Sequence, residues 1–167
     1  MESFVKKTDS VGKLMIDTRG ERELLMTREF DAPRELVWKC HTEPKLVQRW
    51  LLGPPGWTMP VCEIDLRVGG AYRYLWRNAD GREMGMGGVH KEIVAPERLV
   101  TSEKFDDDWT GGETLNTLTL TQHGAGTIYT LAVLYATAAG RAAALKSGMA
   151  DGMEAGYARL DDVLASL

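Results

Sequence analysis

The sequence predicts an α+β domain in which a curved antiparallel sheet is covered by a long C-terminal helix. Two short helical segments follow the first core strand, and a run of strands joined by short glycine-rich turns comes next. Residues 138–167 contain no proline and many alanines, which favours a helix. Sequential strands with short connections favour an antiparallel meander, so we expect this helix to pack on one face of a single sheet.

The composition is that of an ordinary globular protein. The 167 residues are 44% hydrophobic and 26% charged, and the net charge of −4 argues against a nucleic-acid partner. No segment reaches the roughly 18 apolar residues that a bilayer span needs, so we expect no membrane span. We expect residues 1–12 to form a flexible polar tail without a secretory signal, residues 13–167 to form a single domain, and the protein to be cytoplasmic.

The N-terminal third predicts two strands followed by two short helices. Apolar runs indicate strands at residues 14–16 and 24–30, with a glycine-containing turn between them. Asp31 is expected to accept a hydrogen bond from the free N–H groups of the next helix, which continues to His41. A second helix, opened by a proline, is expected over residues 43–50 and is stopped by a Gly-Pro-Pro-Gly segment.

The middle of the chain changes from helical periodicity to a period of two. Six further strands are predicted, at residues 61–67, 71–77, 84–94, 99–105, 115–122 and 127–135. Gly85, Gly87 and Gly88 interrupt the longest of these strands, which indicates a bulge or a sharp bend.

The C-terminal segment is expected to be one helix with a continuous apolar stripe. The stripe residues recur at three- and four-residue steps and are Leu145, Met149, Met153, Tyr157, Leu160 and Leu164. Gly148, Gly152 and Gly156 lie beside this stripe, where each costs roughly 1 kcal/mol of helix propensity relative to alanine. Small residues at these positions would let the helix approach another surface closely.

Several segments, taken in order, resemble one protein family. They are Arg-Glu-Phe-Asp-Ala-Pro-Arg-Glu-Leu-Val-Trp at 28–38, Trp-Leu-Leu-Gly-Pro-Pro-Gly at 50–56, Glu-Ile-Asp-Leu-Arg-Val-Gly-Gly at 63–70, Pro-Glu-Arg-Leu-Val at 96–100, and the glycine pattern of 148–156. Together they resemble the family named for the activator of heat-shock protein 90 ATPase, C-terminal-domain type. The resemblance covers roughly residues 24–167.

This resemblance implies membership of the START-like, or Bet v-like, helix-grip (SRPBCC) superfamily. It implies a seven-stranded sheet around the C-terminal helix, with a cavity that holds lipids, steroids or polyketides in many relatives. Members of the family often carry a tryptophan near the position of Met149, and its replacement here would reshape or enlarge the cavity.

An aromatic and methionine set forms the candidate ligand-binding site. Alternate residues of the strands share a face, and the helix stripe is expected to lie opposite them. The candidates are Trp50, Trp57, Tyr72, Tyr74, Trp76, Met86, His90, Tyr129, Leu131, Val133, Tyr135, Met149, Met153 and Tyr157. The alternative is that the same side chains pack against one another and fill the core.

The remaining polar residues predict no catalytic residue, no metal site and no cofactor. Glu63 and Asp65 are expected on the solvent face of a strand, where Arg67 and Arg73 can pair with them across a hairpin. His41 is expected to be charged at the end of a helix, where the helix dipole favours a cation. Among the three histidines, only His90 is expected to face inward.

Three functions follow from these patterns and the resemblance. The first is binding of a small hydrophobic or amphipathic ligand, such as a lipid, an aromatic or a polyketide-like molecule, in a cavity between the sheet and the C-terminal helix. The second is a co-chaperone-like interaction that stimulates a heat-shock protein 90 ATPase, which makes a chaperone the partner. The third is a cyclase- or hydrolase-type enzyme that uses the cavity. A homodimer is compatible with each.

Overall fold

The computed structural model describes residues 13–167, which form eight strands and four helices. In chain order these are β1 (Met15–Arg19), β2 (Glu23–Phe30), α2 (Arg34–Thr42), α3 (Pro44–Trp50), β3 (Trp57–Ile64), β4 (Ala71–Asn78), β5 (Glu83–Val94), β6 (Arg98–Phe105), β7 (Thr114–His123), β8 (Gly126–Leu134), α4 (Ala138–Lys146) and α5 (Met149–Ala165). The predicted tail, residues 1–12, lies outside the described residues.

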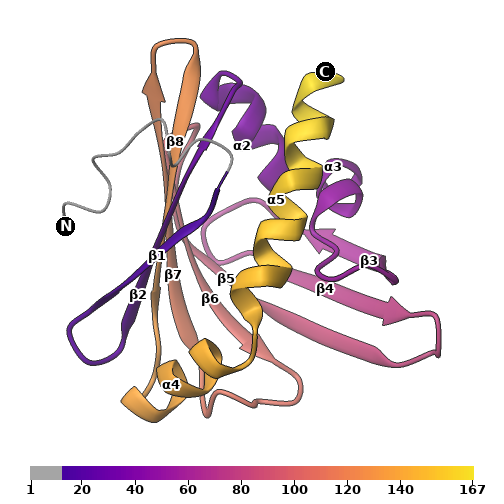
Figure 1. Cartoon of the computed structure of the whole chain (residues 1–167), viewed down its shortest axis with the longest axis vertical. Helices are drawn as coiled ribbons and strands as arrows, with labels where there is room; N and C mark the ends of the chain where they lie inside the picture. The colour runs from indigo at the N-terminus through magenta and orange to yellow at the C-terminus, as the bar shows by residue number, and fades with distance from the viewer. Residues whose placement is uncertain (1–12) are drawn as a thin grey trace.

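The strands form one antiparallel sheet in the order β1-β2-β8-β7-β6-β5-β4-β3. The resemblance implies seven strands, and this count is wrong for the described chain, because β1 adds an edge strand that pairs with β2 from Met15↔Thr27 to Arg19↔Glu23. Helix α5 runs across the concave side of the sheet (Figure 1), with α2 and α3 near its C-terminal end and α4 near its start. The predicted α+β helix-grip architecture is confirmed.

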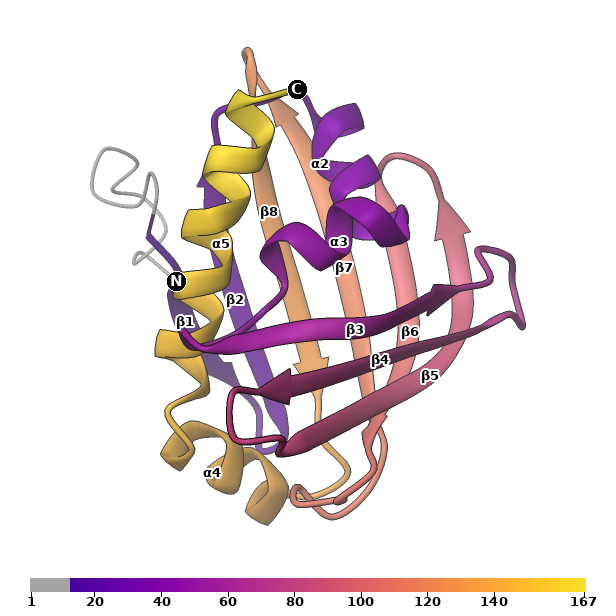
Figure 2. The same ribbon diagram turned by 90° about the vertical axis from the view of Figure 1, so that its right-hand side faces the viewer.

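The sheet curves strongly, so that β3 and β4 run across β6, β7 and β8 in Figure 2. Glycines in β5 permit the bend, because a Cβ on Gly88 would lie 1.9 Å from the backbone oxygen of Ser102 on β6. The predicted irregularity is present, although the shift in pairing register lies between His90 and Glu92, just after the glycines. The curvature of the sheet gives it a concave face.

Helix α2 is not capped by Asp31, which corrects the sequence prediction. The residue before the helix is Pro33, and no side chain caps it from within the segment. Instead, the N–H of Arg34 donates a hydrogen bond to Oε1 of Gln122 on β7 at 3.0 Å. The free donor at the helix start is therefore satisfied by a residue 88 positions away, which local sequence rules cannot show.

The C-terminal segment is two helices, not one. Gly148 adopts a left-handed conformation with φ of 79°, which ends α4 and sets the start of α5. Leu145 therefore leaves the predicted stripe, and its side chain is 45% exposed on α4. Tyr157, Leu160 and Leu164 of α5 remain buried, as expected.

The other two glycines of α5 lie where the helix meets α3 and the segment that follows it. A Cβ on Gly156 would lie 3.2 Å from the backbone oxygen of Trp50, and one on Gly152 would lie 3.6 Å from Pro54. The expectation that small residues let this helix approach a second surface is confirmed at Gly156, whereas the space at Gly152 would also admit a methyl group. The contact fixes one side of α5.

Arg28 fixes the other side of α5. Its side chain points inward from β2, is only 1% exposed, and forms paired hydrogen bonds with Glu154 and with Asp161 at 2.9–3.0 Å. Burial opposes the charged form of Arg28, but the hydrogen bonds to the two carboxylates outweigh it and raise the pKa above its usual value. The guanidinium also lies over the rings of Phe30 and Tyr157. One buried cation thus joins two turns of α5 to the sheet.

No helix within residues 13–167 is long and apolar enough to cross a membrane.

Replacing Arg28 with methionine is expected to destabilise the protein by about 1.5–3 kcal/mol, because the charge-assisted hydrogen bonds to Glu154 and Asp161 are lost while water can still solvate these half-exposed carboxylates. Urea unfolding followed by circular dichroism measures the change. The matched control is Arg98→Met on β6, which removes an exposed ion pair with Glu92 and should cost less than about 1 kcal/mol. Equal losses in the two variants would contradict a central role for Arg28.

Two alanine substitutions four residues apart are expected to have opposite effects on stability. Gly148→Ala should destabilise by about 1 kcal/mol, because alanine disfavours the left-handed conformation. Gly152→Ala should stabilise by up to about 1 kcal/mol, because the position is helical and the added methyl makes only ordinary contact with Pro54. Thermal unfolding of both variants checks the sign, and a loss at Gly152→Ala would contradict the geometry.

Candidate functional site

A cavity of about 650 Å³ lies between the concave face of the sheet and α5. Its wall comes from strands β2 to β8, from α3 and the loop after it, and from the first half of α5. All five tyrosines and four of the five tryptophans of the chain line it. The aromatic residues are thus concentrated around one space.

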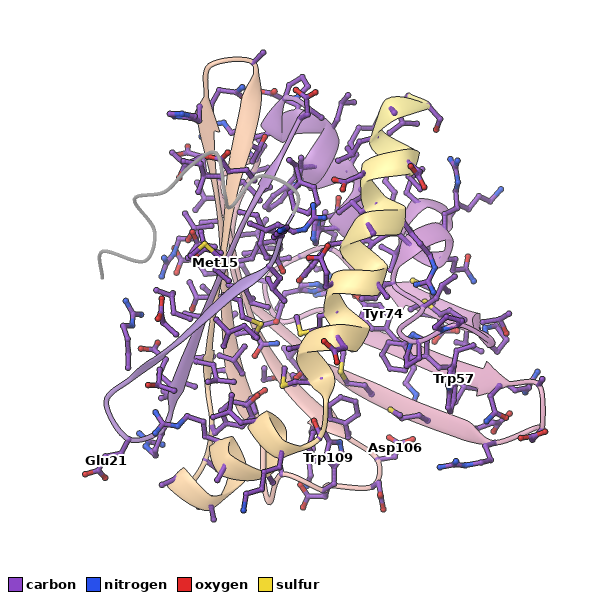
Figure 3. The ribbon with its side chains drawn as sticks, viewed as in Figure 1. Met15, Glu21, Trp57, Tyr74, Asp106 and Trp109 are labelled. Carbon is purple, nitrogen blue, oxygen red and sulfur yellow. The ribbon has the colours of Figure 1, made fainter. Side chains whose placement is uncertain are left out.

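The structure brings every predicted site residue to this cavity. The lining includes Trp50, Trp57, Tyr72, Tyr74, Trp76, Met86, His90, Tyr129, Leu131, Val133, Tyr135, Met149, Met153 and Tyr157. Figure 3 shows Tyr74 and Trp57 on the side of the molecule where β3 and β4 face α5. The alternative, in which these side chains fill the core completely, does not hold, since space remains between them.

The two halves of α5 have different roles. Met149, Met153 and Tyr157 line the cavity. Leu160 and Leu164 instead belong to the buried core that α5 forms with α2 and the sheet. The cavity roof is therefore the N-terminal half of the helix.

Exposed apolar side chains mark where the cavity reaches solvent. Leu66, Met84 and Trp109 line the cavity and are still 42%, 41% and 38% exposed. Large apolar side chains that are both exposed and cavity-lining are typical of the rim of a ligand site. Trp109 lies below Tyr74 and Trp57 in Figure 3, towards α4.

Most tyrosine hydroxyl and tryptophan N–H groups that line the cavity already form hydrogen bonds within the protein. The hydroxyls of Tyr129 and Tyr157 hydrogen-bond to each other. Tyr72 donates to the backbone oxygen of Ser102 at 2.7 Å, and Trp76 donates to that of Leu51 at 2.7 Å.

Tyr74 differs from these residues. Within residues 13–167 its hydroxyl makes no hydrogen bond, although the residue lines the cavity. Burial raises the pKa of Tyr74, so the hydroxyl stays protonated and can donate.

Two histidines line the cavity, and only one of them was expected there. His90 is 3% exposed and its Nδ1 lies 3.1 Å from the backbone oxygen of Gly70, which confirms its inward orientation. His41 also faces the cavity, so its predicted charge at the helix end is wrong. Burial lowers the pKa of His41 to about 4, an effect that the hydrogen bond with the Val37 carbonyl only partly offsets. His41 is therefore neutral near pH 7.

A half-buried carboxyl on the cavity wall is a second polar group that sequence reasoning missed. Glu103 on β6 lines the cavity and accepts hydrogen bonds from Asn116 Nδ2 at 3.1 Å and Thr114 Oγ1 at 3.3 Å. Burial raises the pKa of the Glu103 carboxyl, and these hydrogen bonds offset part of that rise. Glu103 is the only acidic residue in the described lining.

A sequence signal for Glu103 exists, but it is ambiguous. Leu99, Thr101, Glu103 and Phe105 alternate along β6 and all line the cavity. The opposite face of the strand also carries a buried residue at Val100, so the period of two alone does not show which face is inside.

The other charged residues considered from sequence lie outside this cavity. Asp65 pairs with Arg67 at 2.9 Å, two residues along the same segment and not across the hairpin as predicted. Arg73 lies opposite Glu63 in the β3–β4 register, as predicted, but its ion pair is with Asp106 at 2.6 Å. The two side chains meet over Gly85 of β5, which has no side chain to separate them. Within residues 13–167 no group of histidine, cysteine or acidic side chains could hold a metal ion.

Solved structures with the same architecture come from several bacteria. A protein from Rhodobacter sphaeroides is 38% identical, with a TM-score of 0.87 over 93% of this chain and 100% of that one. A protein from Mycobacterium smegmatis is 24% identical, with a TM-score of 0.80 over 92% and 98%. An AHSA1-like protein from Aeromonas hydrophila is 21% identical, with a TM-score of 0.61 over 79% and 90%. The last two likenesses support the fold alone.

The family comparison agrees with the segments noted in the sequence. Among curated proteins, none matches the chain. The family model described as Activator of Hsp90 ATPase homolog 1-like protein matches residues 31–165, which run from the end of β2 to the end of α5. The chain therefore belongs to the family of Activator of Hsp90 ATPase homolog 1-like proteins, within the SRPBCC superfamily.

Proposed function

We propose that this protein binds a small hydrophobic or amphipathic ligand in the cavity between the sheet and α5. The observation that carries the proposal is the cavity of about 650 Å³, with its wall of tyrosine, tryptophan and methionine side chains. Ligand sites in proteins commonly enclose about 300–1,000 Å³ and combine an apolar wall with a few polar groups. The cavity has both properties.

The driving force would be the removal of apolar surface from water. A ligand that buries about 300 Å² of apolar area gains roughly 7.5 kcal/mol at about 25 cal/mol per Å². The loss of translational and rotational freedom offsets part of this gain, which leaves moderate affinity. Water is also a poor occupant of an apolar space of this size, because each ordered water molecule needs several hydrogen-bond partners and the apolar wall offers few.

The wall suits ligands of irregular shape. Five methionines line the cavity, and their unbranched, polarisable side chains adapt to different contours. Two of them, Met149 and Met153, come from the first turns of α5, next to the helix break at Gly148.

A neutral fluorescent probe, N-phenyl-1-naphthylamine, is expected to bind with micromolar affinity and to gain fluorescence on leaving water. Met149→Trp should weaken this binding about tenfold, because the larger ring fills the cavity beneath α5. The matched control is Leu145→Trp, which places the same ring on an exposed position of α4 and should leave the affinity unchanged. Fluorescence titration of the three proteins measures the effect.

Native mass spectrometry of the purified protein, followed by solvent extraction, is expected to show a co-purifying apolar molecule. The bound molecule should be absent from the spectrum of Met149→Trp and present in that of Leu145→Trp, since only the first position lines the cavity. Repeated absence of any bound mass, together with no binding of the fluorescent probe, would overturn the proposed function.

A further inference from the structure

Glu103 is a half-buried carboxyl group on the cavity wall, and it has no cationic partner in the described chain. Both carboxyl oxygens accept one hydrogen bond, from Thr114 and from Asn116. No ion pair among residues 13–167 includes Glu103. Lys104, the neighbouring cation of the lining, is exposed and lies 4.0 Å from Asp108.

Arg28, a fully buried charged residue, has a different environment. Arg28 meets two carboxylates, each through a pair of hydrogen bonds. Burying a charge without a partner is costly, so proteins pair such groups or shift their protonation. Burial raises the pKa of Glu103, and its hydrogen bonds with Asn116 and Thr114 offset part of that rise. Each of its oxygens keeps a second acceptor site for a ligand.

Aromatic side chains surround the same part of the cavity. Burial is the largest cause of the raised pKa of Tyr72 and Tyr74 on β4 and of Tyr135, just after β8, and the negative potential of Glu103 contributes to each rise. The rings of Tyr72 and Tyr74 lie 5.2 Å apart, and those of Tyr74 and Trp76 lie 5.8 Å apart. A carboxyl beside electron-rich ring faces is an environment that stabilises a cation.

We propose that the ligand of this cavity is an apolar or aromatic molecule with one basic nitrogen, whose protonated form pairs with Glu103 while the aromatic wall encloses the rest. The inference rests on the proposed function and narrows it to a ligand class. Ammonium binding supplies the charge partner that the described chain lacks. It also donates to the acceptor sites that Thr114 and Asn116 leave open.

This arrangement discriminates between head groups. A neutral alcohol of the same shape makes one ordinary hydrogen bond with Glu103, whereas an ammonium makes a charge-assisted one. A carboxylate ligand would place a second negative group beside Glu103, with the like-charge repulsion that this entails. The expected order of affinity is therefore amine, then alcohol, then acid.

The test uses three probes with the same ring: 2-(2-naphthyl)ethylamine, 2-(2-naphthyl)ethanol and 2-naphthylacetate. Isothermal titration calorimetry at pH 7 is expected to show the amine binding about tenfold more tightly than the alcohol, with the acid weakest. In Glu103→Gln the amine should lose about tenfold while the alcohol changes less than about threefold, since the amide keeps the shape and can still hydrogen-bond. Alcohol binding thus also reports that the variant is folded.

The matched control is Glu92→Gln on β5, which makes the same chemical change at an exposed carboxylate paired with Arg98. It should keep the full preference for the amine. The inference is overturned if the wild-type protein binds the alcohol as tightly as the amine, or if Glu103→Gln keeps the preference. Binding of the neutral fluorescent probe in those cases would leave the proposed function standing, whereas no binding of any probe would overturn both.

Discussion

The interaction on which the rest of the structure depends is the buried contact of Arg28 with Glu154 and Asp161. It connects the inward face of β2 to two successive turns of α5, so the helix is held at a set position over the sheet. An apolar contact could move closer and close the gap, but a guanidinium between two carboxylates has a required geometry. On the opposite side, the absence of a side chain at Gly156 lets α5 touch α3 directly.

The cavity follows from these two constraints together with the curvature of the sheet. The C-terminal half of α5 packs into a continuous core, whereas its N-terminal half begins at Gly148 and lies over open space. The aromatic wall mostly satisfies its own polar groups, as the Tyr129–Tyr157 pair illustrates. The lining groups that remain able to form hydrogen bonds with a ligand are few, chiefly Glu103, the Tyr74 hydroxyl and His41 Nε2, which is buried without a partner in the described chain. A wall of this kind can bind apolar molecules and still select among head groups.

Local rules predicted the strands and short helices of this chain because their causes are local. Alternation along β4, proline at the start of α3 and the glycines of β5 all act within a few residues. Rules of this kind failed where a distant partner decides the outcome. Gln122 replaces Asp31 at the start of α2, and Asp106 replaces Glu63 as the partner of Arg73. The break at Gly148 was also missed, since glycine inside an apolar helical pattern is compatible with both a continuous and an interrupted helix.

The sequence by itself determined the order of the elements, the family and the set of aromatic and methionine side chains that share one face. These depend on periodicity, turn residues and motif order, which are properties of the linear sequence. Only the tertiary structure decided that the shared face encloses space, that His41 is neutral and that Glu103 points into the cavity. Both faces of β6 carry buried residues, so only the packing of the curved sheet against α5 shows which face is the interior. Burial and charge at a site arise from neighbours far apart in sequence, and for that reason they are properties of the fold.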